Sequence, residues 1–299
     1  MKSAIRYNKK FALPAPSITS ASTDSIEYAE DVLAFQKEKG LTEDGKMGPT
    51  TLAHVRQAVF EKCCSQSLSQ KDYKKIVAIV SKFEGKYWST NRDGEYRGLF
   101  DRPGKPHWAS GKVHIGLSFG FIQFTQDGGQ LGQLLTLMHG KDSGLFREIF
   151  GDHSDELLEV TNRKGRTRVA GRSPRVQTVG GHDLWDNYWI KRFRKAGRNK
   201  AFQDSQLELA VKNFMKPAIR NCEELGFSSE RALALVFDRS VQYGPTGALR
   251  LIKRAGGADK DEHLRLRHLL QTWKGRRWHH RVQKIYMNPT LRDSTFAFE

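Results

Sequence analysis

The sequence predicts a mainly α-helical chain, in which a small helical module precedes a larger, strongly basic module with a short β region. Apolar residues recur at helical spacing in most segments, whereas strict alternation of apolar and other residues runs over residues 113–121. The charge is uneven: residues 1–62 hold nine Lys and Arg against eight Asp and Glu, so the rest of the chain carries +16 of the net charge of +17. A length of 299 residues also fits two domains better than one.

Composition excludes several classes of protein. With 38% hydrophobic residues the chain can fill a core, so it is not globally disordered. No stretch approaches the ~18 to 20 apolar residues of a membrane span, and the first residues lack the apolar segment of a secretory signal. Cys63, Cys64 and Cys222 are too few for a disulfide framework, and we interpret them as free thiols of a chain made in the cytosol. The positive charge favours anionic partners such as nucleic acid, anionic lipid or a cell-wall polymer.

The N-terminal part predicts a tail and a small domain. Residues 1–23 have no apolar period and are rich in turn-forming residues, so we expect a flexible tail. Residues 24–64 form the first predicted domain, with one helix that begins after Asp24 or Ser25 and ends at Gly40. A second helix begins at Pro49, whose ring presets the backbone angle of a helix start.

The turn between these two helices carries a motif. It reads Asp44-Gly45-Lys46-Met47-Gly48-Pro49-Thr50-Thr51 and follows a helix that contains Gln36. This pattern resembles the three-helix peptidoglycan-binding domain of cell-wall hydrolases. The resemblance implies that the module binds the bacterial wall and that its wall-binding residues are Asp44, Gly45, Gly48 and Thr51.

The larger module, residues 65–299, begins with a predicted helix over residues 72–84. Its apolar stripe includes Val77 and Val80, and Glu84 lies on the same side at the end of the helix, with Gly85 closing it. Apolar neighbours and the negative end of a helix both disfavour the charged form of a carboxyl group, which suits a general acid. The alternative is that Glu84 simply turns out to solvent.

The remaining elements follow in order. Strands are predicted at residues 95–100 and 113–121, followed by a helix around residues 131–138. Further helices are expected over residues 183–195, 203–225, 229–243 and 260–286. Pro217 should kink the second of these, and the apolar run Leu233 to Phe237 should lie at the centre of the core.

The segment that begins with Glu84-Gly85 resembles phage-type lysozymes, in which a Glu-Gly pair ends a helix and a catalytic Asp follows nine residues later, before a β-hairpin. Asp93 stands at that position. Glycoside hydrolysis uses two carboxyl groups across the scissile bond, so the resemblance implies Glu84 and Asp93 as catalytic residues. Glu95 and Asp101 are the alternatives for the second carboxylate.

Residues 116–125 resemble the cleft strand shared by lytic transglycosylases, goose-type lysozymes and chitosanase-like enzymes. Ser118, Gln123 and Thr125 are its candidates for hydrogen bonds to substrate, and Gly120 would let a sugar approach the backbone. A wider similarity to chitosanase-type glycoside hydrolases covers about residues 72–295 and implies a two-lobed, lysozyme-like α+β domain with a small sheet in its cleft. The stretch before the strand departs from that family, because residues 112–115 contain no acid.

These features together predict a peptidoglycan hydrolase, similar to modular phage endolysins, that cleaves the glycan backbone by general acid/base catalysis. Chitosan is polycationic and should be repelled by a module of +16, whereas peptidoglycan and the bacterial envelope are anionic. The alternatives are a lytic transglycosylase, a chitosanase-like glycosidase, or a non-enzymatic wall- or nucleic-acid-binding protein. Basic stretches over residues 163–200 and 265–284 support nucleic-acid binding, but no nucleic-acid motif accompanies them.

No metal, other cofactor or nucleic acid is expected as a partner. The sequence lacks a His-Glu-x-x-His motif, and its ten His are scattered, which argues against a zinc amidase. We expect a monomer without a membrane span. It would be made in the bacterial cytoplasm without a signal peptide and act in the periplasm or cell wall after release, as a phage lysis protein or a secreted antibacterial effector.

Overall fold

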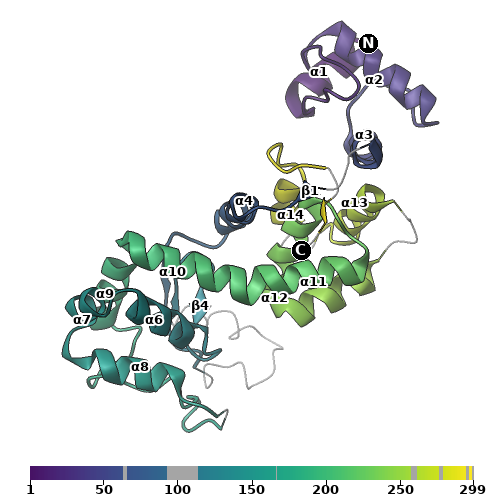
Figure 1. Cartoon of the computed structure of the whole chain (residues 1–299). Coiled ribbons are helices and arrows are strands. Elements are labelled where there is room, and N and C mark those ends of the chain that lie inside the picture. Colours follow the sequence, from purple (N-terminus) through teal and green to yellow (C-terminus); the bar gives the residue numbers. More distant parts are fainter. Residues whose placement is uncertain are drawn as a thin grey trace. The chain divides into compact units, whose positions relative to one another are not determined.

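The structure, a computed structural model, describes residues 1–62, 66–92, 114–165, 167–256, 261–275, 279–293 and 296–297. The chain forms two compact units (Figure 1): a terminal unit of Met1–Ile76 and Phe214–Glu299, and a central unit of Val77–Asn213. The predicted mainly α fold with a small sheet is confirmed. The predicted domain boundary near residue 64 falls inside the terminal unit.

The terminal unit begins with three helices, α1 (Lys2–Phe11), α2 (Ile26–Glu38) and α3 (Pro49–Lys62). Ser25 caps α2, because its side chain accepts a hydrogen bond from the Tyr28 amide. The expected tail is therefore wrong for residues 2–11. The buried Asn8 ties α1 down by bonding the backbone of Gly45 and Met47.

A small hydrophobic core joins these helices to the end of the chain. Met287 packs against it from the C-terminal segment. A unit of this size rarely buries enough apolar surface by itself. The core consists of Ala15, Tyr28, Val32, Phe35, Met47, Leu52 and Val55.

The second half of the terminal unit is helical. Helix α11 (Lys216–Leu225) packs along α12 (Glu230–Ala255), which changes direction at Gly244, just before Pro245. Helix α13 (Glu262–Thr272) packs on α3, and α14 (His279–Tyr286) packs on α12. Two short strands, β1 (Gln66–Ser67) and β5 (Phe296–Ala297), pair in parallel. Leu233 to Phe237 are buried in α12, as predicted.

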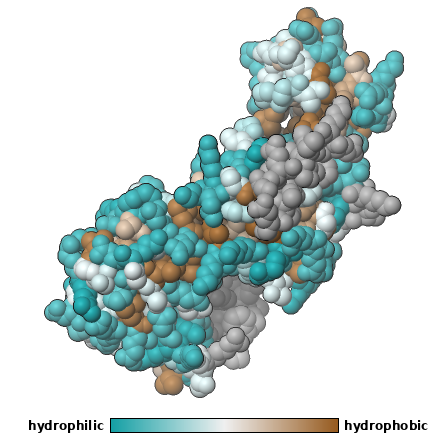
Figure 2. Space-filling view, viewed as in Figure 1, coloured by the Kyte–Doolittle hydropathy of each residue, from teal (hydrophilic) through white to brown (hydrophobic). Residues whose placement is uncertain are grey.

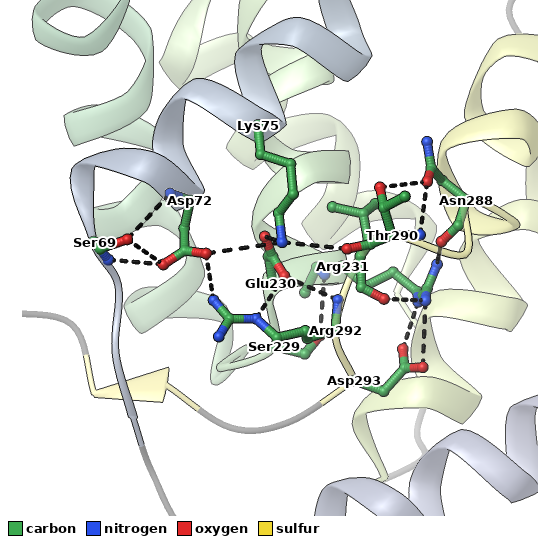
Figure 3. A network of polar contacts seen from close by, with 12 residues as sticks. Ser69, Asp72, Lys75, Ser229, Glu230, Arg231, Asn288, Thr290, Arg292 and Asp293 are labelled. Carbon is green, nitrogen blue, oxygen red and sulfur yellow. Dashed lines mark hydrogen bonds and ion pairs between the residues drawn. The ribbon is translucent and has the colours of Figure 1, made fainter. Parts of the chain in front are cut away.

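A network of charged side chains fastens the terminal unit together (Figure 3). Glu230 is fully buried at the start of α12, and Lys75 and Arg292 reach it at 2.5 and 3.1 Å. Arg292 also pairs with Asp72 of α4 (Gln70–Ser81) at 2.5 Å. The network thus links three segments that are far apart in the sequence.

The same network continues through Arg231. Arg231 is 1% exposed and donates to Asp293 at 2.5 Å and to the carbonyl oxygens of Asn288 and Leu291. Arg56 of α3 also pairs with Asp293, at 3.4 Å. Burial alone would raise the pKa of Asp293, but the charges of Arg231 and Arg56 hold this pKa below its usual value.

The central unit contains an antiparallel sheet of three short strands in sequence order, β2 (Thr90–Asn91), β3 (Ser118–Phe119) and β4 (Phe124–Thr125). The long strand predicted over residues 113–121 is wrong, because Gly116 and Gly120 take positive φ angles and turn the backbone on either side of β3. The strand predicted over residues 95–100 lies outside the described residues.

Helices surround this sheet. They are α6 (Gln130–Lys141), α7 (Ser143–Phe150), a 3-10 turn (Gly151–His153), α8 (Ser154–Asn162), α9 (Asn187–Arg198) and α10 (Lys200–Ala210). The predicted helix over residues 203–225 is α10, a π-helical turn (Val211–Met215) and α11, so the irregularity precedes Pro217 instead of occurring at it.

Aromatic side chains hold the sheet and α9 together. The ring centroids of Phe119 on β3 and Phe193 on α9 are 5.1 Å apart, and Phe150 on α7 lies 5.3 Å from Phe193.

Hydrophilic residues cover most of the face of each unit seen in Figure 2. Within the described part of the chain, no helix combines the length and the apolar character of a membrane span. Cys222 is a buried free thiol; Cys63 and Cys64 lie outside the described residues.

Candidate active site

The central unit has a pocket of about 440 Å³ beside strand β2 and the β3–β4 turn. It brings together one carboxylate, two guanidinium groups, an indole and several uncharged polar side chains. The residues that line it are Glu84, Trp88, Ser89, Thr90, Asn91, Gln123, Arg194 and Arg198.

Glu84 reaches this pocket from a turn that follows helix α4. The helix ends at Ser81, whose carbonyl oxygen accepts hydrogen bonds from the amides of Glu84 and Gly85, both at 3.0 Å. The prediction that the helix extends to residue 84 is therefore wrong by one turn. Gly85 is not a left-handed helix cap either, since its φ is not positive.

Position 85 requires glycine because neighbouring side chains pack closely against it. A Cβ atom there would lie 2.8 Å from the Ser89 hydroxyl oxygen and 3.3 Å from the Gln123 side-chain nitrogen. Ser89 Oγ accepts a hydrogen bond from the Lys86 amide at 2.8 Å, which closes the turn after Glu84. Gly85 thus lets Ser89 and Gln123 approach the residue next to Glu84.

Gln123 enters the pocket from the β3–β4 turn in a strained conformation. Its φ is 58°, a region that residues with a side chain seldom adopt. Its Nε2 donates to the Gly120 carbonyl at 2.8 Å, and its Oε1 is buried with no hydrogen-bond partner in the structure. The hydroxyl of Thr90 on β2 is buried without a partner as well. Strain together with unsatisfied polar atoms is typical of a site that awaits a ligand.

Buried Gln206 of α10 fixes the turn that carries Gln123. Its Oε1 accepts from the Phe121 amide at 3.2 Å, and its Nε2 donates to the Tyr87 carbonyl at 2.9 Å. A Cβ on Gly120 would lie 2.3 Å from that Oε1. The expectation that Gly120 lets a sugar approach the backbone is therefore wrong, because Gln206 fills that space.

Arg194 and Arg198 form the basic wall of the pocket. They lie one turn apart on α9 and thus on the same face of the helix. Helix α9 can approach the backbone of Tyr87 closely because Gly197 has no side chain. A Cβ at that position would lie 2.4 Å from the Tyr87 carbonyl oxygen. The guanidinium carbon of Arg198 is 5.8 Å from the centre of the Trp88 ring. The pocket therefore combines a carboxylate with two cations and an aromatic surface.

Of the other predicted catalytic and substrate-binding residues, Ser118 and Thr125 are not among those that line the pocket. Ser118 is 5% exposed within β3, and Thr125 Oγ1 lies against Gly128 at the opposite end of β4. Asp93, together with Glu95 and Asp101, lies outside the described residues. The structure thus unites Glu84 with Gln123 and leaves Ser118 and Thr125 elsewhere.

The sequence interpretation missed both arginines and Trp88. A signal was present, since residues 163–200 contain 12 basic residues and two acids. Arg194 and Arg198 belong to that run, and their spacing places them together on any helix. The run alone does not tell which of its members face a pocket.

The terminal unit has a second hollow, of about 500 Å³, where the sequence predicted wall binding. Asp44, Gly48 and Thr51 line it together with Tyr7 of α1. Gly45 has a different role: its φ is positive, and a Cβ there would lie 2.9 Å from the Ala29 carbonyl oxygen. It is a packing residue of the turn.

Gln36 holds the residues that line this hollow in place by hydrogen bonds. Its buried Nε2 donates to Asp44 Oδ1 and Thr51 Oγ1 at 3.0 and 3.1 Å, and its Oε1 accepts from the Gly45 amide at 2.8 Å. Burial acts to raise the pKa of Asp44, but hydrogen bonds from the Lys46 amide and from Gln36 outweigh it and lower this pKa. Asp44 therefore presents a fixed negative charge at the rim.

Among the residues that the structure describes, no group of His, Cys, Asp and Glu side chains is arranged to hold a metal ion.

Comparisons with known proteins give distant likenesses in structure. No protein-family model matches the chain, and a search of curated proteins finds no match. A native chitosanase from Bacillus subtilis MY002 is 16% identical, with 73% of this chain and 85% of that chain covered at a TM-score of 0.45. A GH46 chitosanase from Gynuella sunshinyii, in complex with chitotetraose, is 16% identical over 73% of this chain and 84% of that chain, also at 0.45. Chitosanase OU01 with substrate is 16% identical over 74% and 82%, at 0.44. At these scores the likeness establishes neither family nor activity.

Proposed function

We propose that this chain is a glycoside hydrolase that cleaves the glycan backbone of peptidoglycan, with Glu84 as the general acid. The observation that carries the proposal is the Glu84 pocket itself. It sets a carboxyl group beside two buried, unpartnered polar groups, Thr90 Oγ1 and Gln123 Oε1, and beside two arginines. Such groups suit a polyhydroxylated ligand that also carries negative charge.

The chemistry assigned to Glu84 is proton transfer to the glycosidic oxygen. Protonation turns the departing sugar into a neutral alcohol and leaves positive charge on the sugar that stays. The Gln123 amide oxygen and the Thr90 hydroxyl would hold sugar hydroxyl groups and so fix the bond near Glu84. Asp93 remains our proposal for the second carboxylate, on the strength of its position nine residues after Glu84.

The two arginines indicate the class of glycan. Peptidoglycan carries free carboxylates on its stem peptides, and Arg194 and Arg198 would attract them. The ammonium groups of chitosan would instead be repelled by the same side chains and by the net charge of +17. We therefore favour peptidoglycan as the substrate.

The hollow of the terminal unit supports wall binding. Asp44 and Thr51 are held by Gln36 at its edge, and Lys46 adds a cation beside them. We propose that this hollow holds a wall fragment, in a modular enzyme of the endolysin type that acts on the wall after release from the cytoplasm.

Digestion of purified sacculi tests the proposal. The full chain and its Glu84→Gln variant are incubated with sacculi, and the soluble products are analysed by mass spectrometry. We expect glycan fragments with a reducing-end muramic acid or glucosamine from the wild type, and almost none from the variant. Release of peptides without glycan cleavage, or equal release by both proteins, would contradict the proposal; anhydromuramic ends would identify a lytic transglycosylase instead.

A further inference from the structure

The central unit contains another pocket, of about 400 Å³, that shares no residue with the Glu84 pocket. It lies at the other end of strand β4: Gln123 precedes that strand, and Asp127 follows it. At ~3.3 Å per residue in a strand, the two residues are at most ~13 Å apart along the backbone. The pocket is lined by Asp127, Gly128, Gly165, Arg168, Ser173 and Arg175.

A fully buried glutamine holds the walls of this pocket in place. Gln126 Oε1 accepts from the Leu117 amide at 3.0 Å, and its Nε2 donates to the Arg175 carbonyl at 2.7 Å. A Cβ at Gly116 would lie 2.2 Å from that Oε1, so glycine is required there. The loop that carries Ser173 and Arg175 is thus fastened to the sheet, and the pocket is a built feature of the fold.

The charges in the pocket leave one cation in excess. Arg168 neutralises Asp127, because its Nη2 lies 2.5 Å from Asp127 Oδ2, and its Nη1 donates to the carbonyls of His114 and Gly171. Arg175 donates to the Asp127 carbonyl at 3.3 Å. A guanidinium group has five N–H donors, and no other bond from Arg175 to a protein acceptor occurs in the described part of the chain.

Ser173 supplies the second, independent observation. The residue is 2% exposed, and its hydroxyl is buried without a hydrogen-bond partner although it lines the pocket. A buried hydroxyl without a partner is costly, so such groups in native proteins are normally satisfied by the protein, by water or by a ligand. The Ser173 hydroxyl and the remaining donors of Arg175 are thus both available to an acceptor in this pocket.

We propose that this pocket binds a carboxylate. A carboxylate has one negative charge and two acceptor oxygens, which match the single excess cation and the Arg175 and Ser173 donors. A phosphate dianion would bring a second negative charge close to the Asp127 carboxylate, so it fits less well. Together with the proposed function, on which this identification rests, the carboxylate is that of a peptidoglycan stem peptide whose glycan lies at Glu84.

Titration calorimetry with the full chain tests the site directly. The probes are a soluble stem tetrapeptide, the same peptide with amidated carboxyl groups, and inorganic phosphate. Arg175→Gln and Ser173→Ala are the test variants. Arg147→Gln, an exposed arginine of α7 that pairs loosely with Asp155 at 3.9 Å, is the matched control. Thermal melting shows that each variant is folded.

We expect the tetrapeptide to bind about tenfold more weakly to Arg175→Gln and several-fold more weakly to Ser173→Ala, with no change in the control. Equal affinity in both test variants, or equal binding of the amidated peptide, would overturn the site; tighter binding of phosphate would overturn its assignment to a carboxylate. Sacculus cleavage by Glu84→Gln separates the two proposals: if that variant cleaves normally while Arg175→Gln and Ser173→Ala still lose peptide binding, the proposed function fails and the carboxylate site stands.

Discussion

In the terminal unit, Glu230 is fully buried, and Lys75 and Arg292 both pair with it, while Arg231 divides its donors between Asp293 and backbone carbonyls. In the central unit, the Gln123 oxygen and the Thr90 hydroxyl are equally hidden from solvent but have no partner. Both regions bury polar groups beside arginines. In this network the charged side chains pair with one another, whereas the two oxygens of the Glu84 pocket have no hydrogen-bond partner in the structure.

This difference indicates which buried polar groups stabilise the fold and which are available for function. Removing one partner of a buried, hydrogen-bonded ion pair costs about 3 to 5 kcal/mol, because the remaining charge is left without compensation. Leaving a buried acceptor unsatisfied costs ~1 to 3 kcal/mol in the folded state. A fold retains that cost where the group has another use, so the Glu84 pocket is where we expect activity without a large contribution to stability.

The largest expected effect is that of Glu84→Gln on activity. Loss of the proton donor should slow sacculus hydrolysis by a factor of ~10² to 10⁴. Urea unfolding should change little, because glutamine has the same shape and Glu84 is only partly buried in a turn. Glu148→Gln, which removes an exposed partner of Lys195, is the control for the loss of a carboxylate. A Glu84→Gln protein that is active but unstable would show that Glu84 contributes to stability and not to catalysis, contrary to this prediction.

Arg231→Met should have the opposite profile. It leaves Asp293 with a weaker partner and the backbone carbonyls of Tyr286 and Leu291 without a donor, so unfolding should require about 3 to 5 kcal/mol less. Urea denaturation of the full chain measures this. Lys253→Met in the same helix removes an exposed ion pair with Glu224 and should cost no more than about 1 kcal/mol. Similar losses in both variants would show that the buried network contributes no more to the free energy of unfolding than an exposed ion pair.

As the pH falls, the terminal unit should lose stability before carboxylates with ordinary pKa values become protonated. Burial lowers the pKa of His263 to about 4 from 6.5. The unfolded chain therefore binds this proton first as the pH falls, and stability should drop by on the order of 3 kcal/mol between about pH 6.5 and pH 4. Asp293, whose pKa is lowered, should lose its contribution only below the ordinary range for Asp.

Urea unfolding at a series of pH values tests this order. The His263→Gln variant should lack the part of the decline above about pH 4, while Asp293 still causes a loss at lower pH. If the wild type and the variant lose stability in parallel over this interval, His263 is not its cause.

The sequence predicted the fold where the pattern is local. The helical period identified α2, α3 and the buried core of α12, and a capping serine marked where α2 begins. It failed for α1, which depends on bonds from Asn8 to residues 37 and 39 positions away. It also failed for the long strand, because side chains from elsewhere, Gln126 and Gln206, occupy the space beside Gly116 and Gly120.

The candidate site was likewise predictable only where its residues belong to a local sequence motif. Glu84 and Gln123 belong to recognisable segments, and the structure brings both into one pocket. The resemblance of residues 116–125 to a cleft strand suggested that Ser118 and Thr125 would join them, but neither lines the pocket. Arg194 and Arg198 reach the pocket only because Gly197 lets α9 pack against the Tyr87–Trp88 backbone, a contact between segments more than 100 residues apart.

The smallest expected effect concerns Arg194 and Arg198, the two arginines to which the proposed function assigns a ligand. Arg194→Gln and Arg198→Gln should each weaken sacculus binding by about 0.2 to 1 kcal/mol, the range for partly exposed charge pairs, and the loss should shrink as salt rises. Neutral N-acetylated chitooligosaccharides should bind these variants and the wild type alike. Lys195→Gln on the same helix removes one charge away from the pocket, where Lys195 pairs with Glu148, and is the matched control. If Lys195→Gln weakens binding as much as Arg194→Gln, the attraction comes from net charge and not from the pocket. If only the two arginine variants respond, and only toward the anionic glycan, the basic wall beside Glu84 selects the substrate.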